Sequence, residues 1–158
     1  MEILKVKSSA FDEGNWMPER YTARGEDVSP GFELADINPA AKSVAITLDD
    51  ASHPLFPNYN HWVIWNIPVQ DLIPEGISHG KYVDRLNGAV QGIAYGRHRY
   101  KGPKPPFKTI HTYVFTFYIL DSKLELAANS RKRDFLDKID GHTLQQASIS
   151  GKFQSHRL

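Results

Sequence analysis

Hydrophobic and polar residues alternate along several segments of the chain with the period of β-strands. In Ser43–Asp50, large aliphatic residues occupy every second position from Val44 to Leu48, and the positions between them are small or hydroxylated. His61–Ile67 and His111–Leu120 are rich in β-branched and aromatic residues at successive positions, which is typical of strands that are covered on both faces. Two shorter strand candidates are Glu2–Lys7 and Ile149–Phe153.

Helical periodicity is confined to the C-terminal part of the chain. Ser130–Ile139 carries an apolar stripe that includes Phe135 and is followed by Gly141, a common stop signal, so the pattern predicts a helix there. A second, short helix is expected over His142–Ala147. Because strands dominate and do not alternate with helices, we expect an all-β fold, an antiparallel β-sandwich with a few short peripheral helices.

Composition and charge narrow the class of protein. The 158 residues match the size of one domain, so we expect a single domain over residues 1–158. Hydrophobic residues make up 41% and the net charge is +1, which is typical of a globular protein that does not bind nucleic acid through bulk charge. No cysteine is present, which excludes disulfides and zinc–thiolate sites.

The sequence also shows no targeting signal. The N-terminal residues show no signal-peptide core, and no apolar run reaches the roughly 20 residues of a membrane span. We therefore expect a cytoplasmic protein without a membrane span, and nothing in the sequence calls for a cofactor.

Polar residues stand at the ends of three of the expected strands. Asp50, His61 and His111 each occupy a strand end on a face that becomes apolar further along. Tyr113 follows His111 on the same face, roughly 7 Å away at about 3.3 Å per residue. A carboxylate beside an imidazole fixes its tautomer and turns its other nitrogen toward a ligand, so we expect these residues to line a pocket mouth. By the same alternation, one face of the second strand is expected to carry His61, Val63, Trp65 and Ile67.

A rigid loop precedes the third strand. In Gly102–Pro106 (GPKPP) each proline fixes φ near about −65° and removes a backbone donor, while Gly102 permits close approach of the backbone. The loop is therefore expected to form a wall of the pocket. The preceding basic and aromatic segment, Arg97–Lys101, is either a solvated loop or a docking site for an anionic ligand or a partner.

Other interpretations of these residues remain open. A histidine at the start of a strand is often purely structural, Asp50 can cap a turn, and a proline-rich loop can be a simple connector. An enzymatic alternative is a metal site, with zinc or iron held by Asp50, His53, His61 and His111. The chain contains neither a G-x-S-x-G nor an H-E-x-x-H motif, so binding without turnover is the favoured interpretation.

Five segments in order carry a resemblance that spans nearly the whole chain. They are MPERYTARGEDVSP (17–30), KSVAITLDD (42–50) followed by His53-Pro54, HWVIWNIP (61–68), GPKPPFKTIHTYVF (102–115) and DGHTLQQASISGKF (140–153). This series resembles the phosphatidylethanolamine-binding protein family, in its bacterial and archaeal branch that is often called Raf kinase inhibitor-like.

The resemblance implies both a fold and a function. It implies two antiparallel sheets in a Greek-key arrangement, with a small pocket at one end for phosphate or the phosphoryl head of phosphoethanolamine. Family members are associated with kinase regulation and serine-protease inhibition, so a protein partner and a homodimer are also implied. The implied pocket residues are Asp50, Pro54, His61, Gly102, Pro105, Pro106, His111 and Tyr113.

The chain departs from the family pattern at the pocket mouth. Ala51, Ser52 and His53 replace the proline, aspartate and alanine of the "DPDAP" signature; Thr112 replaces the arginine of "HRY", and Lys108 replaces a glycine. Losing an aspartate and an arginine together fits the loss of one supporting ion pair. The added His53 and Lys108 make the mouth more basic and change the expected ligand preference, and His53 joins the expected ligand-binding residues.

Affinity for a phosphate-like anion is expected to rise between about pH 7.5 and 6, because imidazoles titrate near about pH 6.5.

Overall fold

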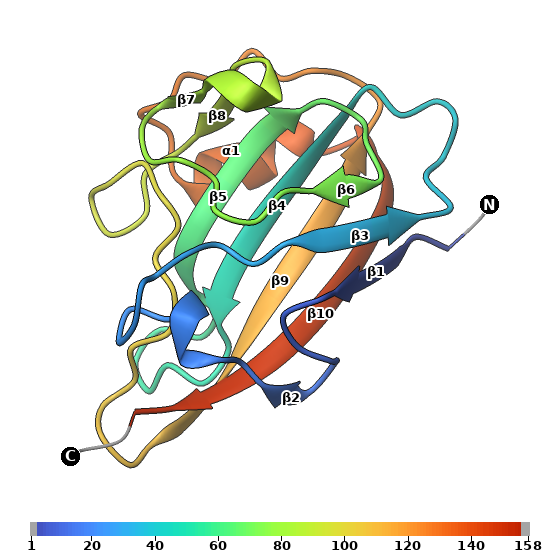
Figure 1. Cartoon of the computed structure of the whole chain (residues 1–158). Coiled ribbons are helices and arrows are strands. Elements are labelled where there is room, and N and C mark those ends of the chain that lie inside the picture. Colours follow the sequence, from blue (N-terminus) through green and yellow to red (C-terminus); the bar gives the residue numbers. More distant parts are fainter. Residues whose placement is uncertain (1–2, 156–158) are drawn as a thin grey trace.

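The computed structural model describes residues 3–155, which form two β-sheets, one α-helix and two short 3₁₀ turns (Figure 1). The larger sheet has the strand order β2-β10-β9-β4-β5-β8-β7, and the smaller sheet has the order β1-β3-β6. Within these residues no helix has the length and apolar character needed to cross a membrane. The elements are β1 (Lys5–Ser8), β2 (Asn15–Trp16), η1 (Glu19–Tyr21), β3 (Phe32–Ala35), β4 (Ser43–Asp50), β5 (Tyr59–Ile67), β6 (Leu72–Ile73), β7 (Tyr82–Val83), η2 (Asp84–Leu86), β8 (Ala89–Gln91), β9 (Ile110–Leu120), α1 (Lys132–Ile139) and β10 (Thr143–Gln154).

The larger sheet has Greek-key connectivity. β4, β5 and β8 lie side by side in the sheet, and after β8 the chain returns so that β9 pairs with the far side of β4. The pairs along this path are antiparallel, as expected. The short edge strand β2 is an exception, because Asn15 and Trp16 pair in parallel with β10.

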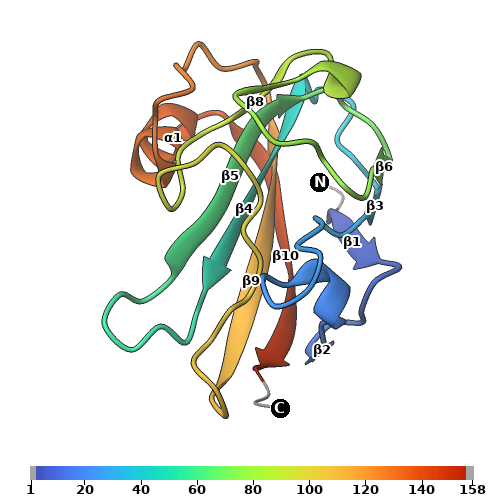
Figure 2. The same ribbon diagram turned by 60° about the vertical axis from the view of Figure 1, so that its left-hand side comes forward.

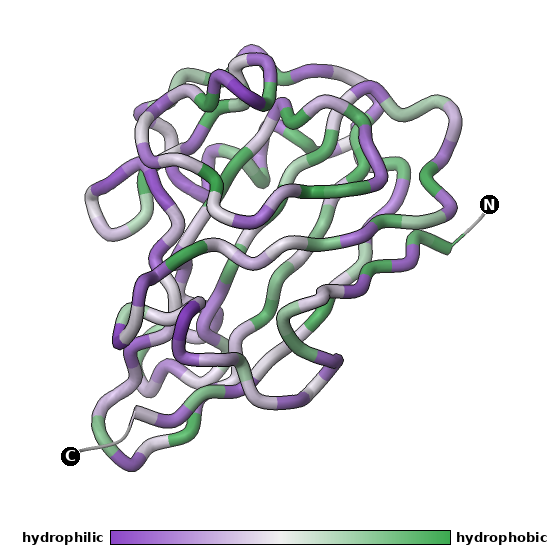
Figure 3. Tube along the Cα trace, viewed as in Figure 1, coloured by the Kyte–Doolittle hydropathy of each residue, from purple (hydrophilic) through white to green (hydrophobic). Residues whose placement is uncertain are grey.

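Apolar cores cover both faces of the larger sheet. On one face Ile46 and Phe117 are fully buried beneath the smaller sheet, where Phe32 meets Phe117 at 4.8 Å between ring centroids. On the other face Trp65 stacks on Phe135 of α1, with the ring centroids 6.0 Å apart. Figure 2 shows α1 and the smaller sheet on opposite sides of the central strands, and Figure 3 shows hydrophobic residues recurring along those strands. Burial on both faces explains why these strands show little polar alternation.

Most of the predicted elements are present. β4 spans Ser43–Asp50, as predicted, whereas β5 and β9 begin two residues and one residue before their predicted starts. α1 begins at Lys132, later than predicted. The backbone N–H of Arg131, the residue before the helix, donates to the Asp134 carboxylate at 2.9 Å. The first strand, predicted from Glu2, is observed as β1 at Lys5–Ser8, and Glu2 itself lies outside the described residues.

The predicted second helix is wrong. Residues 143–154 form the long strand β10, which is hydrogen-bonded to β9 along its length. A helix of six residues gains little from its own hydrogen bonds, so pairing with a neighbouring strand overrides local preference. The side chain of Gln145 is buried in the strand, where its amide donates to Asp36 O and its oxygen accepts the Asn38 N–H.

The prediction that alternate residues of β5 share one face of the sheet is correct only in the middle of the strand. Val63 and Trp65 share the face that packs toward α1, but Ile67 belongs to the core on the opposite face. The register with β4 shifts between the partners of Val44 and Ile46, and Asn66 has a positive φ of 60°. This bulge adds one residue to β5 and so reverses the side on which Ile67 lies.

Candidate functional site

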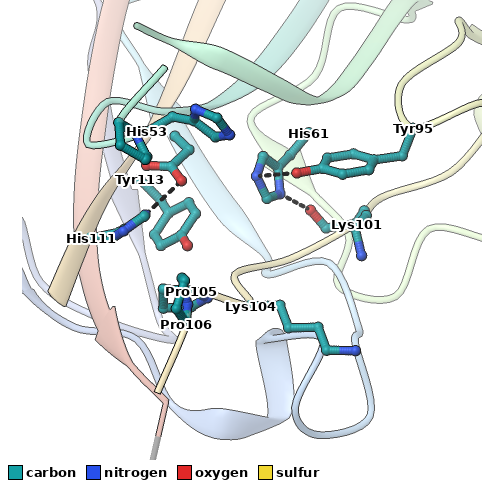
Figure 4. Close-up of a pocket in the computed structure, with 11 residues that line it drawn as sticks. His53, His61, Tyr95, Lys101, Lys104, Pro105, Pro106, His111 and Tyr113 are labelled. Carbon is teal, nitrogen blue, oxygen red and sulfur yellow. Dashed lines mark hydrogen bonds and ion pairs between the residues drawn. The ribbon is translucent and has the colours of Figure 1, made fainter. Parts of the chain in front are cut away.

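A cavity of about 310 Å³ lies at one end of the larger sheet, where β4 ends and β5 and β9 begin (Figure 4). Because β4 is antiparallel to both neighbours, its last residue meets their first residues at the same edge of the sheet. The cavity is lined by Asp50, His53, Pro54, His61, Tyr95, Lys101, Lys104, Pro105, Pro106, His111 and Tyr113. It therefore gathers eight of the nine ligand-binding residues expected from the sequence.

Asp50 and His111 form a buried pair at the base of the cavity. The Nδ1 atom of His111 lies 2.7 Å from Oδ2 of Asp50, and the two residues are only 8% and 3% exposed. The other carboxylate oxygen accepts the backbone N–H of Ser52 at 2.9 Å. A carboxylate oxygen accepts, so Nδ1 of His111 carries the proton and its Nε2 is the ring nitrogen available to the cavity.

His61 reaches the cavity because β5 has a second bulge. The register with β4 shifts just after the pair Leu48↔Trp62, which leaves His61 as an extra residue. In a bulge, the side chain of the extra residue can lie on the same face of the sheet as that of the residue next to it in the chain. The His61 ring accordingly lies edge-on to Tyr113, with 5.5 Å between centroids, and the expectation that it shares a face with Val63 is wrong.

The hydrogen bonds of His61 define its tautomer. Nδ1 lies 2.9 Å from the carbonyl oxygen of Lys101, so it donates and carries a proton. Nε2 lies 3.4 Å from the hydroxyl of Tyr95, which donates to it when the ring is neutral. Burial lowers the pKa of His61, partly offset by the bond to Lys101 and by the charge of Asp50. The ring is therefore neutral near pH 7, and it presents an N–H at Nε2 only after protonation.

Two phenols complete the inner surface. Tyr113 lies between the imidazoles, with its centroid 5.5 Å from that of His61 and 6.3 Å from that of His111. Burial raises the pKa of Tyr95 to about 12, and burial together with the charge of Asp50 raises that of Tyr113 still further. Both hydroxyls therefore remain protonated at neutral pH and can donate hydrogen bonds.

The proline-rich loop forms one wall of the cavity, as predicted. Pro105 and Pro106 lie on the lining, below the histidines in the view of Figure 4. Gly102 is not on the lining. Its N–H donates to Asp27 at 2.8 Å, and a Cβ at this position would lie 2.3 Å from the carbonyl oxygen of Tyr21. Gly102 therefore allows the loop to pack tightly against the segment behind it.

The far side of the cavity contains residues that were not predicted as ligand-binding residues from the sequence. Tyr95, Lys101 and Lys104 line it, and the Lys101 ammonium lies over the ring of Tyr95, 4.8 Å from the centroid. The lysines had a signal in the sequence, since they flank and interrupt the Gly102–Pro106 loop. Tyr95 had none, because it reaches His61 from a loop turn in which its φ is 52°.

The departures from the family pattern have structural consequences. Ser52 and Thr112 are in contact, because the N–H of Thr112 donates to Oγ of Ser52 at 2.9 Å, so a neutral hydrogen bond joins the positions of the expected ion pair. His53 lies on the lining, stacks on Tyr59 at 4.9 Å and accepts two backbone N–H groups at Nδ1. Lys108 is not on the lining, and its carbonyl accepts the side-chain amide of Gln154.

Replacing Ser52 with alanine is expected to destabilise the protein by about 1 kcal/mol, because the Thr112 N–H loses its acceptor. Urea denaturation of the two proteins measures the difference. The exposed Ser78 provides the control, and its alanine variant should match the wild type. Equal stability of all three proteins would show that the contact contributes nothing.

The metal-site alternative is not favoured by this geometry. Within residues 3–155, no three His, Asp or Glu side chains are arranged to hold a metal ion. Two of the proposed ligands also use a ring nitrogen elsewhere: Nδ1 of His61 donates to Lys101, and Nδ1 of His53 accepts backbone N–H groups.

Sequence comparisons agree with the family resemblance of the five sequence segments. A family model described as "Phosphatidylethanolamine-binding protein" matches residues 7–154. A UPF0098 protein of Pyrococcus abyssi is 36% identical over 155 residues, which cover 97% of this chain and 86% of the relative. A UPF0098 protein of Methanothermobacter thermautotrophicus is 34% identical over 157 residues, which cover 96% of this chain and 99% of the relative.

Solved structures have the same architecture. A crystal structure of a phosphatidylethanolamine-binding protein homologue of Chlamydia trachomatis superposes with a TM-score of 0.84 at 28% identity, over 97% of this chain and 98% of the other. Escherichia coli YbcL superposes with a TM-score of 0.87 at 22% identity, over 98% of this chain and 99% of YbcL. The second likeness supports the fold alone.

Proposed function

The chain belongs to the phosphatidylethanolamine-binding protein family, and from this premise we propose that the cavity binds a small phosphate-type anion without turning it over. Inorganic phosphate and the phosphoryl head of phosphoethanolamine are ligands of this chemistry. The roles expected from the sequence for a kinase or serine-protease partner, a homodimer and a cytoplasmic location stay predictions.

The pairing of Asp50 is the observation that carries this proposal. An unpaired carboxylate at the base of the cavity would repel an anion, but both oxygens of Asp50 already accept hydrogen bonds, from His111 and from Ser52. The remaining polar groups on the lining are potential donors. They comprise the imidazole of His53, the hydroxyls of Tyr95 and Tyr113, the ammonium groups of Lys101 and Lys104 and, when their Nε2 atoms are protonated, the imidazoles of His61 and His111.

Protonation of His61 couples anion binding to pH. The neutral ring has only a lone pair at Nε2, whereas the protonated ring offers an N–H with a positive charge to a phosphoryl oxygen. Burial lowers the pKa of His61 in the free protein. The proton that accompanies anion binding is therefore taken up at a lower pH than the ordinary histidine pKa of about 6.5 suggests. The pH window expected from the sequence therefore moves downward.

Sulfate is the appropriate probe, because it stays dianionic while phosphate itself titrates near neutral pH. Sulfate affinity should rise between pH 7 and pH 5, by up to about tenfold per pH unit for each proton taken up. NMR titration at several pH values, followed at the imidazoles of His61 and His111, measures it. In His61→Asn the dependence should flatten, while His142→Gln, which changes an exposed residue in the turn between α1 and β10, should keep it. A flat profile in the wild type would contradict the proposal.

Binding rather than turnover is supported by the groups on the lining. The lining residues include no serine, threonine or cysteine that an imidazole could activate as a nucleophile. Asp50 is committed to His111 and Ser52, so it is not free to act as a general base. The same groups serve well as fixed donors around an anion that enters and leaves unchanged.

A further inference from the structure

A second, smaller hollow adjoins the cavity on the other side of Tyr95. It has a volume of about 160 Å³ and is lined by Ala94, Tyr95, Arg97, Arg99 and Lys101. Tyr95 and Lys101 also line the main cavity, so the two hollows share a wall. The hydroxyl of Tyr95 points toward His61 in the main cavity, as Figure 4 shows, while the Lys101 ammonium lies over its ring.

Positive charge is concentrated in this hollow and is only partly compensated. Arg97, Arg99 and Lys101 form no ion pair within 4.0 Å in the part of the chain that the structure describes. The nearby carboxylate is that of Asp27, which interacts electrostatically with Arg99 and Lys101 and accepts the N–H of Gly102. Burial lowers the pKa of Lys101, the charge of Asp27 partly offsets this shift, and the neighbouring cations Lys104 and Arg99 lower the pKa further. Asp27 thus offsets part of the positive charge of Arg99 and Lys101, and it is not an electrostatic partner of Arg97.

We propose that this hollow is a second anion subsite, and that the ligand is a phosphomonoester that carries a carboxylate a few bonds from its phosphate. The phosphate occupies the cavity between His61 and His111, and the carboxylate meets Arg97 and Arg99 beyond Tyr95. This proposal rests on the proposed function of the main cavity. A guanidinium presents two parallel N–H groups that match a carboxylate, which a single ammonium does not.

Phosphoserine and phosphoethanolamine provide a matched pair of probes, because they differ only in the carboxylate. The wild-type protein should bind phosphoserine about tenfold more tightly than phosphoethanolamine, as expected for one charge-assisted pair. In Arg97→Gln/Arg99→Gln this preference should disappear, whereas phosphoethanolamine affinity should fall by less than about threefold. Isothermal titration calorimetry at constant pH and ionic strength measures all four affinities.

Two further variants separate specific recognition from bulk charge. Arg133→Gln removes a positive charge from the exposed side of α1 and should keep the preference for phosphoserine. Arg97→Lys/Arg99→Lys keeps the charge but removes the paired donors, and should retain only part of the preference.

The outcomes distinguish the subsite from the main site. Phosphoethanolamine binding without any preference for phosphoserine would overturn the subsite alone. A preference that survives in the Arg97→Gln/Arg99→Gln protein would also overturn it, because the carboxylate would then lie elsewhere. Failure of the wild type to bind either probe would overturn both proposals.

Discussion

Replacing His111 with alanine is expected to lower the free energy of unfolding by about 3 kcal/mol and to abolish anion binding. The substitution removes the Nδ1–H donor from Asp50, which is 3% exposed and would keep only the N–H of Ser52. Breaking a buried pair by removing one partner is costly, because the remaining charge is left without compensation. The same uncompensated charge would repel a phosphate or sulfate ion from the cavity.

The double variant Asp50→Asn/His111→Ala tests this explanation. Removing the charge should recover about 1–2 kcal/mol of the lost stability, measured by urea denaturation. His142 forms a similar pair with Asp121, at 2.9 Å, but both side chains are more than 40% exposed. His142→Ala should therefore cost less than about 1 kcal/mol. If the double variant is as unstable as His111→Ala, the buried charge is not the cause of the loss.

The part of the site that depends on regular strand geometry was predictable from the sequence. Asp50 and Tyr113 pair directly across β4 and β9, and that stretch of the ladder has no register shift. Side chains two residues apart share a face, so His111 and Tyr113 fall together without any knowledge of the loops. Because β4 and β9 are antiparallel, the end of β4 lies beside the start of β9, and the carboxylate of Asp50 and the imidazole of His111 therefore lie at the same edge of the sheet.

The rest of the site depends on features that no periodicity reveals. His61 faces the cavity only because a bulge adds a residue to β5, and its tautomer is set by the carbonyl of Lys101, forty residues away in the sequence. Tyr95 arrives from a loop turn. The misassigned helix over residues 142–147 has the same origin, since the long pairing of β10 with β9 decides its structure. Tertiary contacts override local preference in all of these cases.

Gly102 lies behind the wall of the cavity rather than on its lining. The resemblance implies that it is a pocket residue, yet the cavity lining does not include it. Its role follows from the space around it: a Cβ would lie 2.3 Å from the carbonyl oxygen of Tyr21 and 2.7 Å from the carboxylate of Asp27. The adjoining residue Lys101 supplies the carbonyl that holds His61, so the position of this backbone sets the geometry of the ring.

Gly102→Ala is accordingly expected to destabilise the protein by about 3 kcal/mol and to weaken sulfate binding at least about tenfold, because the backbone atoms that meet the new Cβ cannot move aside cheaply. Displacement of the loop would also pull Lys101 O away from His61. Gly31→Ala is the matched control: the nearest atom to its Cβ is 3.4 Å away, and it should unfold and bind like the wild type. Urea denaturation and sulfate titration on the same samples distinguish direct contact of Gly102 with the ligand from support of the cavity wall. A variant that keeps full stability but loses affinity would show that Gly102 contacts the ligand directly, whereas a joint loss follows if it spaces the wall of the cavity.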